Sequence, residues 1–359
     1  IAYIQNDYNT GYMHGDIKGA YLSDTDTTNL TGSELVTNGS FGSDVSGWQT
    51  SDSTNTYSSG KMQITRSGGS GGTSYQTITT VVGTRYVATA EVNSTGSRGD
   101  LVIKDGTGWS GTTLGVASGT AGQLKTLSVT FTATSTTTSV AFSIDNNGTS
   151  IIVDNISVRV GEEDRSVNNI GLAVVGTINK NPVASGADLV AYSGFTGSSY
   201  MSYSASKMGF GTGDFSVSVW CIPSTDQSNE FILELNDASD SNRFYFLVTN
   251  TTTKRLYLPW DSDIAGSELN AGEWNHIVVG RSNGYGFVYV NGKWISDGYK
   301  PYTTNLVSYG RGTIGNYSAG PTNDYAWSGS LALLRISGSV PSPEQIKKMY
   351  EDEKVLFQE

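Results

Sequence analysis

The stretch from Gly213 to Tyr350 constrains the fold most strongly, because short apolar runs alternate in it with turn signals. Residues 213–223 place Phe, Val, Val and Cys in alternation with Ser, Ser and Trp before a proline, a period of two that predicts a half-buried strand. Residues 286–290 are apolar on both faces, which indicates a central strand of a covered sheet. Asn291-Gly292 then supplies the positive φ angles of a type I′ hairpin turn. The stretch therefore predicts a β-sheet domain.

The end of the chain carries its one clear helix signal. Ser342 can cap the helix, Pro343 stands at the first helical position, and Gln345 completes a capping box. One helical stripe is apolar and contains Ile346, Met349 and Tyr350. We expect a helix over residues 342–354 that docks on the sheet through this stripe.

Composition agrees with a β fold. Only 15% of the residues are charged and 44 are glycine, which suits short strands and tight turns. A chain of 359 residues is too long for one sandwich and sufficient for two. The net charge of −11 argues against nucleic acid and anionic membranes as partners, because phosphate contacts need clustered Lys and Arg. No run of 18 apolar residues occurs, so no membrane insertion is expected.

Catalytic constellations are sparse. Cys221 is the only cysteine, so no intrachain disulfide can form, and its place in an apolar strand predicts a buried, inert thiol. The two histidines, His14 and His276, lie far apart, and His276 is interpreted as a structural residue. The sequence contains no metalloprotease helix motif, phosphate-binding glycine loop or nucleophile elbow. We therefore expect a protein that is not an enzyme.

The order of landmarks in the second half resembles a laminin G-like domain of the concanavalin A-like type. The landmarks are Gly213–Pro223, Gly272–Val279, Gly286–Trp294, Thr313–Gly315, Trp327–Ile336 and Ser342–Tyr350. The resemblance implies a two-sheet sandwich that presents a glycan- or protein-binding face, and only some domains of this kind are enzymes.

Glycosidases of the concanavalin A-like fold carry Glu-x-Asp-x-x-Glu along one strand. The nearest segment here, Glu230 to Asp237, lacks that spacing. Glu230 and Glu234 would share a strand face about 13 Å apart, which exceeds the separation that either glycosidase mechanism needs.

A second series of alternating strands fills residues 33–160. Its segments are 35–41, 47–48, 76–92, 126–134, 139–144 and 150–158. Their order resembles the jelly-roll carbohydrate-binding modules of the family 4/9 type, which implies a second sandwich. Such modules commonly hold a structural calcium between their first and last strands, and Asn38, Ser40 and Asp154 stand at the matching positions. The alternative is that Asp154 only bonds to a neighbouring turn.

The predicted fold is therefore all-β, with two β-sandwich (jelly-roll) domains in tandem and one short C-terminal helix. Residues 1–32 are interpreted as a tether or the end of a preceding domain, since the chain begins at Ile and reads as a piece of a longer polypeptide. The jelly-roll module takes residues 33–160, and the polar break at 161–166 is interpreted as a linker. The laminin G-like sandwich takes residues 167–359.

Planar aromatic side chains in loops are the candidate ligand-binding residues, because such rings stack on sugars. The candidates are Trp109, Trp260, Tyr317 and Tyr325. Tryptophans at fold landmarks are expected to pack in the core instead: Trp48, Trp220, Trp274 and Trp327.

Two short stretches, residues 7–28 and 341–354, are similar to segments of marine bacteriophage structural proteins. This resemblance implies a phage tail fibre or virion appendage, at the virion surface or extracellular, that recognises cell-surface glycans of the host without catalysis. One alternative is a purely architectural virion or fibrillar protein that packs against sister copies or other virion proteins. Another is the glycan-binding portion of a secreted bacterial multidomain protein.

Overall fold

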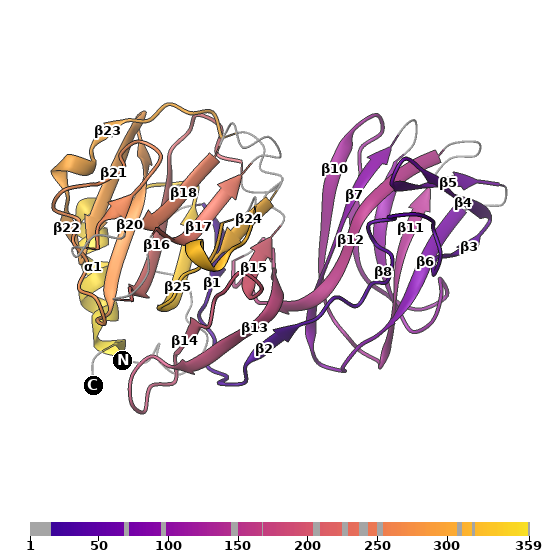
Figure 1. Ribbon diagram of the computed structural model, residues 1–359, viewed down its shortest axis with the longest axis horizontal. Coiled ribbons are helices and arrows are strands. Elements are labelled where there is room, and N and C mark those ends of the chain that lie inside the picture. The colour runs from indigo at the N-terminus through magenta and orange to yellow at the C-terminus, as the bar shows by residue number, and fades with distance from the viewer. Residues whose placement is uncertain are drawn as a thin grey trace. The chain divides into compact units, whose positions relative to one another are not determined.

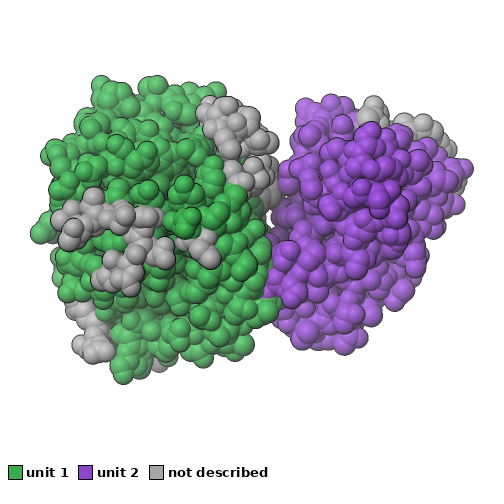
Figure 2. Space-filling model, in the orientation of Figure 1, with its two compact units in different colours: residues 1–31, 162–169, 174–359 green, residues 32–161, 170–173 purple. Residues whose placement is uncertain are grey.

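The chain divides into two compact units, each built from antiparallel sheets (Figures 1 and 2). Unit 1 takes residues 1–31, 162–169 and 174–359, and unit 2 takes residues 32–161 and 170–173. The computed structural model describes residues 16–67, 72–94, 98–144, 150–166, 168–203, 209–224, 229–236, 243–249, 254–306, 311–317 and 320–357. The prediction of an all-β fold is confirmed. Within the described part of the chain, no helix is long and apolar enough to cross a membrane.

Unit 2 is a sandwich of two five-stranded sheets. One sheet has the order β3 (Gln49–Ser51), β6 (Gly72–Thr79), β11 (Thr137–Ile144), β8 (Gly99–Asp105) and β9 (Thr113–Ser118). The other has the order β10 (Leu124–Thr132), β7 (Arg85–Ser94), β12 (Ser150–Glu162), β5 (Lys61–Arg66) and β4 (Ser53–Ser58). Trp48 is buried as predicted, with its ring centroid 6.1 Å from that of Phe41 and 5.8 Å from that of Phe142.

Unit 1 has a larger sheet around the pair β16 (Phe215–Ile222) and β25 (Ser330–Ser337). β16 continues through β20 (Asn275–Ser282) to β21 (Tyr285–Val290), which pairs with β22 (Lys293–Trp294) and β23 (Lys300–Pro301). On its other side β25 pairs with β1 (Ile17–Tyr21) and β14 (Val190–Ser193). The sheet continues from β14 to β13 (Leu172–Pro182), and β13 pairs in turn with β2 (Leu30–Gly32). The second sheet has the order β15 (Tyr200–Tyr203), β24 (Arg311–Ile314), β17 (Glu230–Asn236), β18 (Arg243–Val248) and β19 (Leu256–Tyr257).

The N-terminal segment is part of unit 1, so the interpretation of residues 1–32 as a tether is wrong for its described part. β1 pairs with β25, with Ala20 opposite Arg335 and Tyr21 opposite Leu334. Both Ala20 and Tyr21 are buried, and burial of apolar side chains fixes the strand in place. Unit 2 is therefore inserted in the chain between two parts of unit 1.

The polar break at residues 161–166 is not an exposed linker, which corrects the interpretation made from its charge. Glu162, Asp164 and Ser166 are all buried. Asp164 accepts hydrogen bonds from the backbone N–H groups of Ala20 and Ser166, at 2.9 and 2.8 Å. These bonds compensate the cost of burying the carboxylate and attach the segment to β1.

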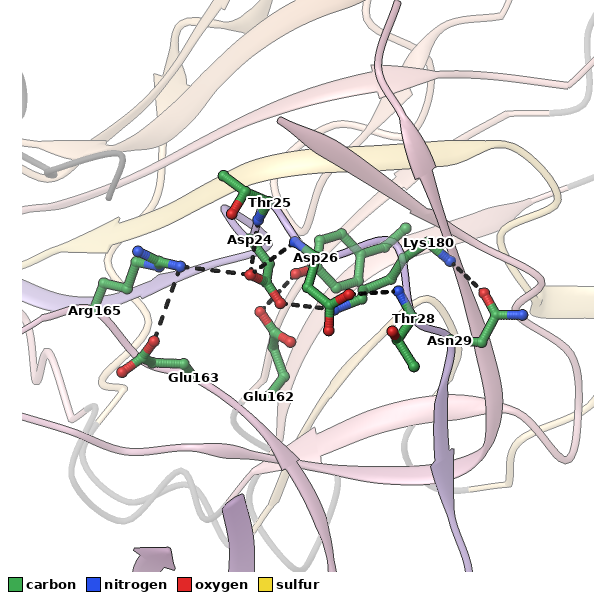
Figure 3. A network of polar contacts seen from close by, with 10 residues as sticks. Asp24, Thr25, Asp26, Thr28, Asn29, Glu162, Glu163, Arg165 and Lys180 are labelled. Carbon is green, nitrogen blue, oxygen red and sulfur yellow. Dashed lines mark hydrogen bonds and ion pairs between the residues drawn. The ribbon is translucent and has the colours of Figure 1, made fainter. Parts of the chain in front are cut away.

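A partly buried polar network surrounds this segment (Figure 3). The Lys180 ammonium lies 2.7 Å from an Asp24 carboxylate oxygen, and the lysine side chain is 1% exposed. Glu162 accepts a hydrogen bond of 2.7 Å from the Tyr192 hydroxyl. Burial raises the pKa of Glu162 from its ordinary 4.5 to about 7. The network therefore contains a carboxyl group that exchanges its proton near neutral pH.

The C-terminal helix forms as predicted. α1 spans Pro343–Glu353, and its capping box joins Ser342 and Gln345 in both directions. Trp220 of β16 donates a hydrogen bond of 2.7 Å to Glu353, whose other carboxylate oxygen lies 2.5 Å from Arg335. The helix thus covers the outer face of β16, so the strand is buried on both faces and not half-buried as expected.

Other local predictions are confirmed around α1. Asn291 and Gly292 have φ angles of 49° and 73°, as the hairpin turn requires.

The predictions for buried side chains are also confirmed. Cys221 is a buried free thiol, and burial raises its pKa. His276 is buried beside the Ser218 hydroxyl at 2.9 Å, and burial lowers its pKa from 6.5 to about 3, so the ring is neutral at physiological pH. Trp327 is fully buried, and Trp274 packs on Phe357 at 4.7 Å between ring centroids.

Candidate functional site

A cavity of about 310 Å³ opens on the smaller sheet of unit 1. Its lining residues are Asn229, Phe231, Arg243, Tyr245, Leu247, Tyr257, Tyr317 and Tyr325. Five of these are aromatic and one is charged. We call this cavity the aromatic pocket.

The pairing of β17, β18 and β19 brings the lining residues to one face. Along β18, the pocket residues Arg243, Tyr245 and Leu247 alternate with buried Phe244 and Phe246, as the period of a strand requires. Directly paired residues share a face, so Leu247 brings in its two partners, one on each neighbouring strand. Those partners are Phe231 of β17 and Tyr257 of β19.

Ring contacts hold the aromatic wall in position. Tyr245 and Tyr257 stack with centroids 5.6 Å apart and planes inclined by 23°. The Phe231 centroid lies 5.5 Å from that of Tyr317 and 5.8 Å from that of Tyr325. These spacings fall in the favourable range for aromatic pairs. Tyr325 is 39% exposed, so part of the wall faces solvent.

The polar groups of the pocket are hydroxyls and one guanidinium. The Arg243 guanidinium carbon lies 4.8 Å from the Tyr245 ring centroid. Burial, followed by the neighbouring Tyr257, raises the pKa of Tyr245 to about 12, so its hydroxyl stays neutral at physiological pH. The pocket can therefore pack against a ring-shaped ligand and exchange hydrogen bonds with its polar substituents.

Two of the four residues predicted to bind ligand lie together in this pocket, namely Tyr317 and Tyr325. Trp109 belongs to unit 2 and is 37% exposed, with the Lys104 ammonium 4.8 Å from its ring centroid. The predicted ligand residues therefore divide between two separate units.

Trp260 is a packing residue, which corrects the prediction that it faces a ligand. Its indole N–H donates to the Gly298 carbonyl at 3.0 Å, and its ring lies 4.8 Å from that of Tyr302. A Cβ added at Gly286 would approach the Trp260 ring to 2.2 Å, so the indole lies directly against the backbone of β21.

Sequence reasoning missed Phe231, Arg243, Tyr245 and Tyr257, because all four stand in or beside apolar runs typical of a core. One signal was available in β18. Its alternate positions carry Arg and Tyr, which seldom occupy the fully buried side of a strand.

A second group of exposed aromatic residues lies on the larger sheet of unit 1. Tyr285, Trp294 and Tyr299 are 40%, 44% and 48% exposed. Tyr285 and Tyr299 stack with centroids 4.8 Å apart and planes inclined by 13°. We call these three residues the edge cluster.

The residues proposed to hold calcium have other partners. The Asp154 carboxylate lies 3.1 Å from the Lys61 ammonium and accepts the N–H of Asn155. The Asn38 amide donates to oxygen atoms of Asp44 and Ser46. The described residues contain no group of three or more His, Cys, Asp or Glu placed to hold a metal. Asn38 and Asp154 therefore already have partners in this structure, and a calcium ion held by Asn38, Ser40 and Asp154 stays a prediction that requires Lys61 to move away.

The two glutamates of β17 do not share a face, contrary to the expectation from their spacing. The register shifts between Phe231 and Leu233, which indicates a bulge. Glu230 is paired with buried Val248 and accepts a hydrogen bond of 2.5 Å from Ser328, whereas Glu234 is paired with the pocket residue Tyr245. Because they lie on opposite faces, they cannot act together as an acid and a nucleophile.

Residues 195–347 match the family model described as the Concanavalin A-like lectin/glucanases superfamily. This range contains every residue of the aromatic pocket. This match supports the prediction of a laminin G-like, concanavalin A-like domain in the second half of the chain. A comparison with curated proteins gave no match.

Solved structures show low similarity to the chain. Domain 4 of AbnA, a GH43 extracellular arabinanase from Geobacillus stearothermophilus, solved with arabinotriose, is 18% identical with a TM-score of 0.40, covering 52% of this chain and 92% of its own. The CBM40 of the Ruminococcus gnavus IT-sialidase is 12% identical with a TM-score of 0.35, covering 42% and 92%. The ligand binding domain of Botulinum neurotoxin serotype D, solved with N-acetylneuraminic acid, is 14% identical with a TM-score of 0.39, covering 54% and 48%. These values are too low to transfer a function.

Proposed function

We propose that unit 1 binds glycans without catalysis through the aromatic pocket. The observation that supports this most directly is the enclosure of one cavity by five aromatic rings and one arginine. Aromatic faces pack against the apolar C–H faces of sugar rings, while hydroxyl and guanidinium groups bond to their hydroxyls. A volume of about 310 Å³ is at the small end of ligand pockets, which suits a short part of a longer glycan.

The chemistry of the described pocket residues supports binding rather than hydrolysis. A glycosidase needs two carboxyl groups beside one glycosidic bond. The described lining of the pocket contains no carboxyl group, and nearby Glu234 is fully buried and paired with Arg243. The concanavalin A-like superfamily takes its description from both lectins and glucanases, and this pocket fits the first of these two roles.

For the biological setting, we propose a phage tail fibre or similar virion appendage that recognises cell-surface polysaccharide of the host. This proposal rests on the two short stretches of sequence that resemble phage structural proteins, and it places the chain at the virion surface. The same pocket would serve a secreted bacterial multidomain protein equally well.

Purely architectural assembly is the second candidate function, and the edge cluster favours it. Three exposed aromatic rings on one sheet offer a surface for sister copies or other virion proteins. Sedimentation of the intact chain and of Trp294→Ala tests this candidate. Assembly predicts concentration-dependent association that the substitution weakens.

A glycan array with the intact chain tests the binding proposal. We expect Tyr317→Ala and Tyr325→Ala each to weaken binding roughly 2- to 10-fold, since an aromatic contact contributes about 0.5–1.5 kcal/mol beyond area burial. Trp294→Ala is the matched control, because it removes an exposed ring outside the pocket. If neither tyrosine substitution alters binding while the melting temperature is unchanged, the pocket is not the glycan site.

A further inference from the structure

Arg243 is the one charged residue among the described residues that line the aromatic pocket. It stands at the start of β18, on the strand face that also presents Tyr245. Its side chain is 35% exposed, so the guanidinium is accessible from the cavity without being fully hydrated. The other polar side chains among these described residues are neutral, namely the tyrosines and Asn229.

The guanidinium is held in place but keeps its hydrogen-bonding capacity. Its Nη1 atom lies 3.7 Å from a Glu234 carboxylate oxygen, which exceeds normal hydrogen-bond length. It also lies over the Tyr245 ring at 4.8 Å. Within the part of the chain that the structure describes, the guanidinium makes no other polar contact. Its N–H fork is therefore available to a ligand.

We infer that the aromatic pocket selects an anionic glycan and that Arg243 binds its acid group. This inference rests on the proposed glycan-binding function and specifies the ligand class. The planar fork of Arg matches a carboxylate or sulfate group with two parallel hydrogen bonds, and stacking on Tyr245 orients that fork beside the ring wall. A sugar ring on the tyrosines would then place its acid substituent at Arg243.

Two features of the chain oppose this binding and make the test sharper. Glu234 is fully buried and competes for the Arg243 charge from the protein side. The net charge of −11 also repels anionic polymers over long distances. Affinity for an acidic glycan must therefore come from the local contact with Arg243, and removal of the Glu234 charge should strengthen it.

Pairs of glycans that differ only in charge test the inference, measured with the intact chain on an array and by calorimetry. The pairs are sialyllactose and lactose, oligogalacturonate and its methyl ester, and a sulfated and an unsulfated galactan. We expect the acidic member of at least one pair to bind 10- to 100-fold more tightly, roughly the effect of hydrogen bonds to a charged group. The carboxylate and sulfate pairs distinguish which acid group is preferred.

Variants of the two charged residues give effects of opposite sign. Arg243→Gln should lower the affinity for the acidic member to that of its neutral partner, and Arg243→Lys should retain part of the preference through its charge. Glu234→Gln should tighten acidic binding severalfold. Because Arg243→Lys keeps a cation beside buried Glu234, it remains informative if Arg243→Gln does not fold.

The outcomes separate this inference from the proposed function. Equal binding of acidic and neutral members, weakened by Tyr325→Ala but unchanged in Arg243→Gln and Arg243→Lys, would overturn the inference and leave glycan binding in place. Acidic binding that is indifferent to Tyr317→Ala, Tyr325→Ala and both arginine variants would refute the pocket itself. No binding to any member of the array would refute the proposed function together with the inference.

Discussion

Substitution of Glu162 by Gln should remove the decrease in unit 1 stability that Glu162 causes between pH 4.5 and 7. Glu162 is 4% exposed and accepts the Tyr192 hydroxyl, and burial is the main cause of its raised pKa. The charged neighbours in the network act in both directions, since Asp24 raises this pKa while Lys180 and Arg165 lower it. Gln keeps the hydrogen-bond acceptor and removes the charge.

The sign follows from proton binding in the two states. The pKa of Glu162 is about 7 in the folded chain and 4.5 in its ordinary environment, so between these values the folded state holds a proton that the unfolded state has lost. The stabilisation is fully present below pH 4.5 and is lost as pH rises through 7. A pKa difference of this size corresponds to about 3 kcal/mol, at roughly 1.36 kcal/mol for each tenfold change in proton affinity. The lowered pKa of Asp24 acts at more acid pH and leaves this window unaffected. Buried His276 acts in the opposite direction, because its lowered pKa of about 3 makes stability increase with pH up to its ordinary value of 6.5.

Tryptophan fluorescence reports this transition, because five of the seven tryptophans lie in unit 1. His276 contributes equally to the wild type and to Glu162→Gln, so a comparison of the two isolates the effect of Glu162. Between pH 4.5 and 8 we expect the melting temperature of the variant to rise relative to that of the wild type by about 6–12 °C, since 1 kcal/mol shifts a unit of this size by roughly 2–4 °C. At pH 8, where Glu162 is charged in the wild type, the variant should be the more stable of the two.

Glu163→Gln is the matched control, because this neighbouring carboxyl group has a side chain that is 42% exposed. It should leave the pH profile close to that of the wild type. Equal slopes for the wild type and Glu162→Gln would refute the assignment of this pH dependence to Glu162.

Three further predictions concern packing and metal binding. Trp220→Ala should lower the free energy of unfolding of unit 1 by about 3–5 kcal/mol, as expected for a buried tryptophan, and Trp260→Ala should also lower it. Trp109→Ala should change the free energy of unfolding by no more than about 0.5 kcal/mol, because its ring is exposed. Thermal denaturation compares all three variants with the wild type. Ser342→Ala should lower the free energy of unfolding by about 1 kcal/mol through loss of the helix cap. Urea denaturation measures this loss, with a substitution at exposed Ser40 as the control. Because Lys61 already pairs with Asp154, we expect excess chelator to leave the melting of unit 2 unchanged in calorimetry; a fall that Asp154→Ala abolishes would establish the calcium site instead.

The sequence predicts those features whose causes are local. The capping box of Ser342 and Gln345 and the turn at Asn291 each depend on a few adjacent residues, and the structure shows both. Pairing between strands that are distant in the sequence has no comparable local signal. Ala20 lies opposite Arg335 across more than 300 residues of chain, so a segment that looks like a tether completes a sheet.

Charge in the sequence was a poor guide to exposure at residues 161–166. Four consecutive charged residues are typical of a solvated linker, yet Glu162 and Asp164 are buried. Their compensating partners come from elsewhere in the chain: Tyr192 for Glu162, and the backbone N–H of Ala20 for Asp164. Only the tertiary structure brings those partners into reach, because a buried charge is tolerated where it is hydrogen-bonded or paired.

The aromatic pocket depends on the bulge in β17, and no residue type in that strand predicts the bulge. In a regular strand, Phe231 and Glu234 would point to opposite faces, because they are separated by an odd number of positions. The register shift between Phe231 and Leu233 turns both toward the pocket face and moves Glu230 into the core. One bulge thus places the two glutamates of β17 on opposite faces of the sheet. The same bulge sets Glu234 beside Arg243, and this arrangement determines the balance of charge at the proposed glycan site.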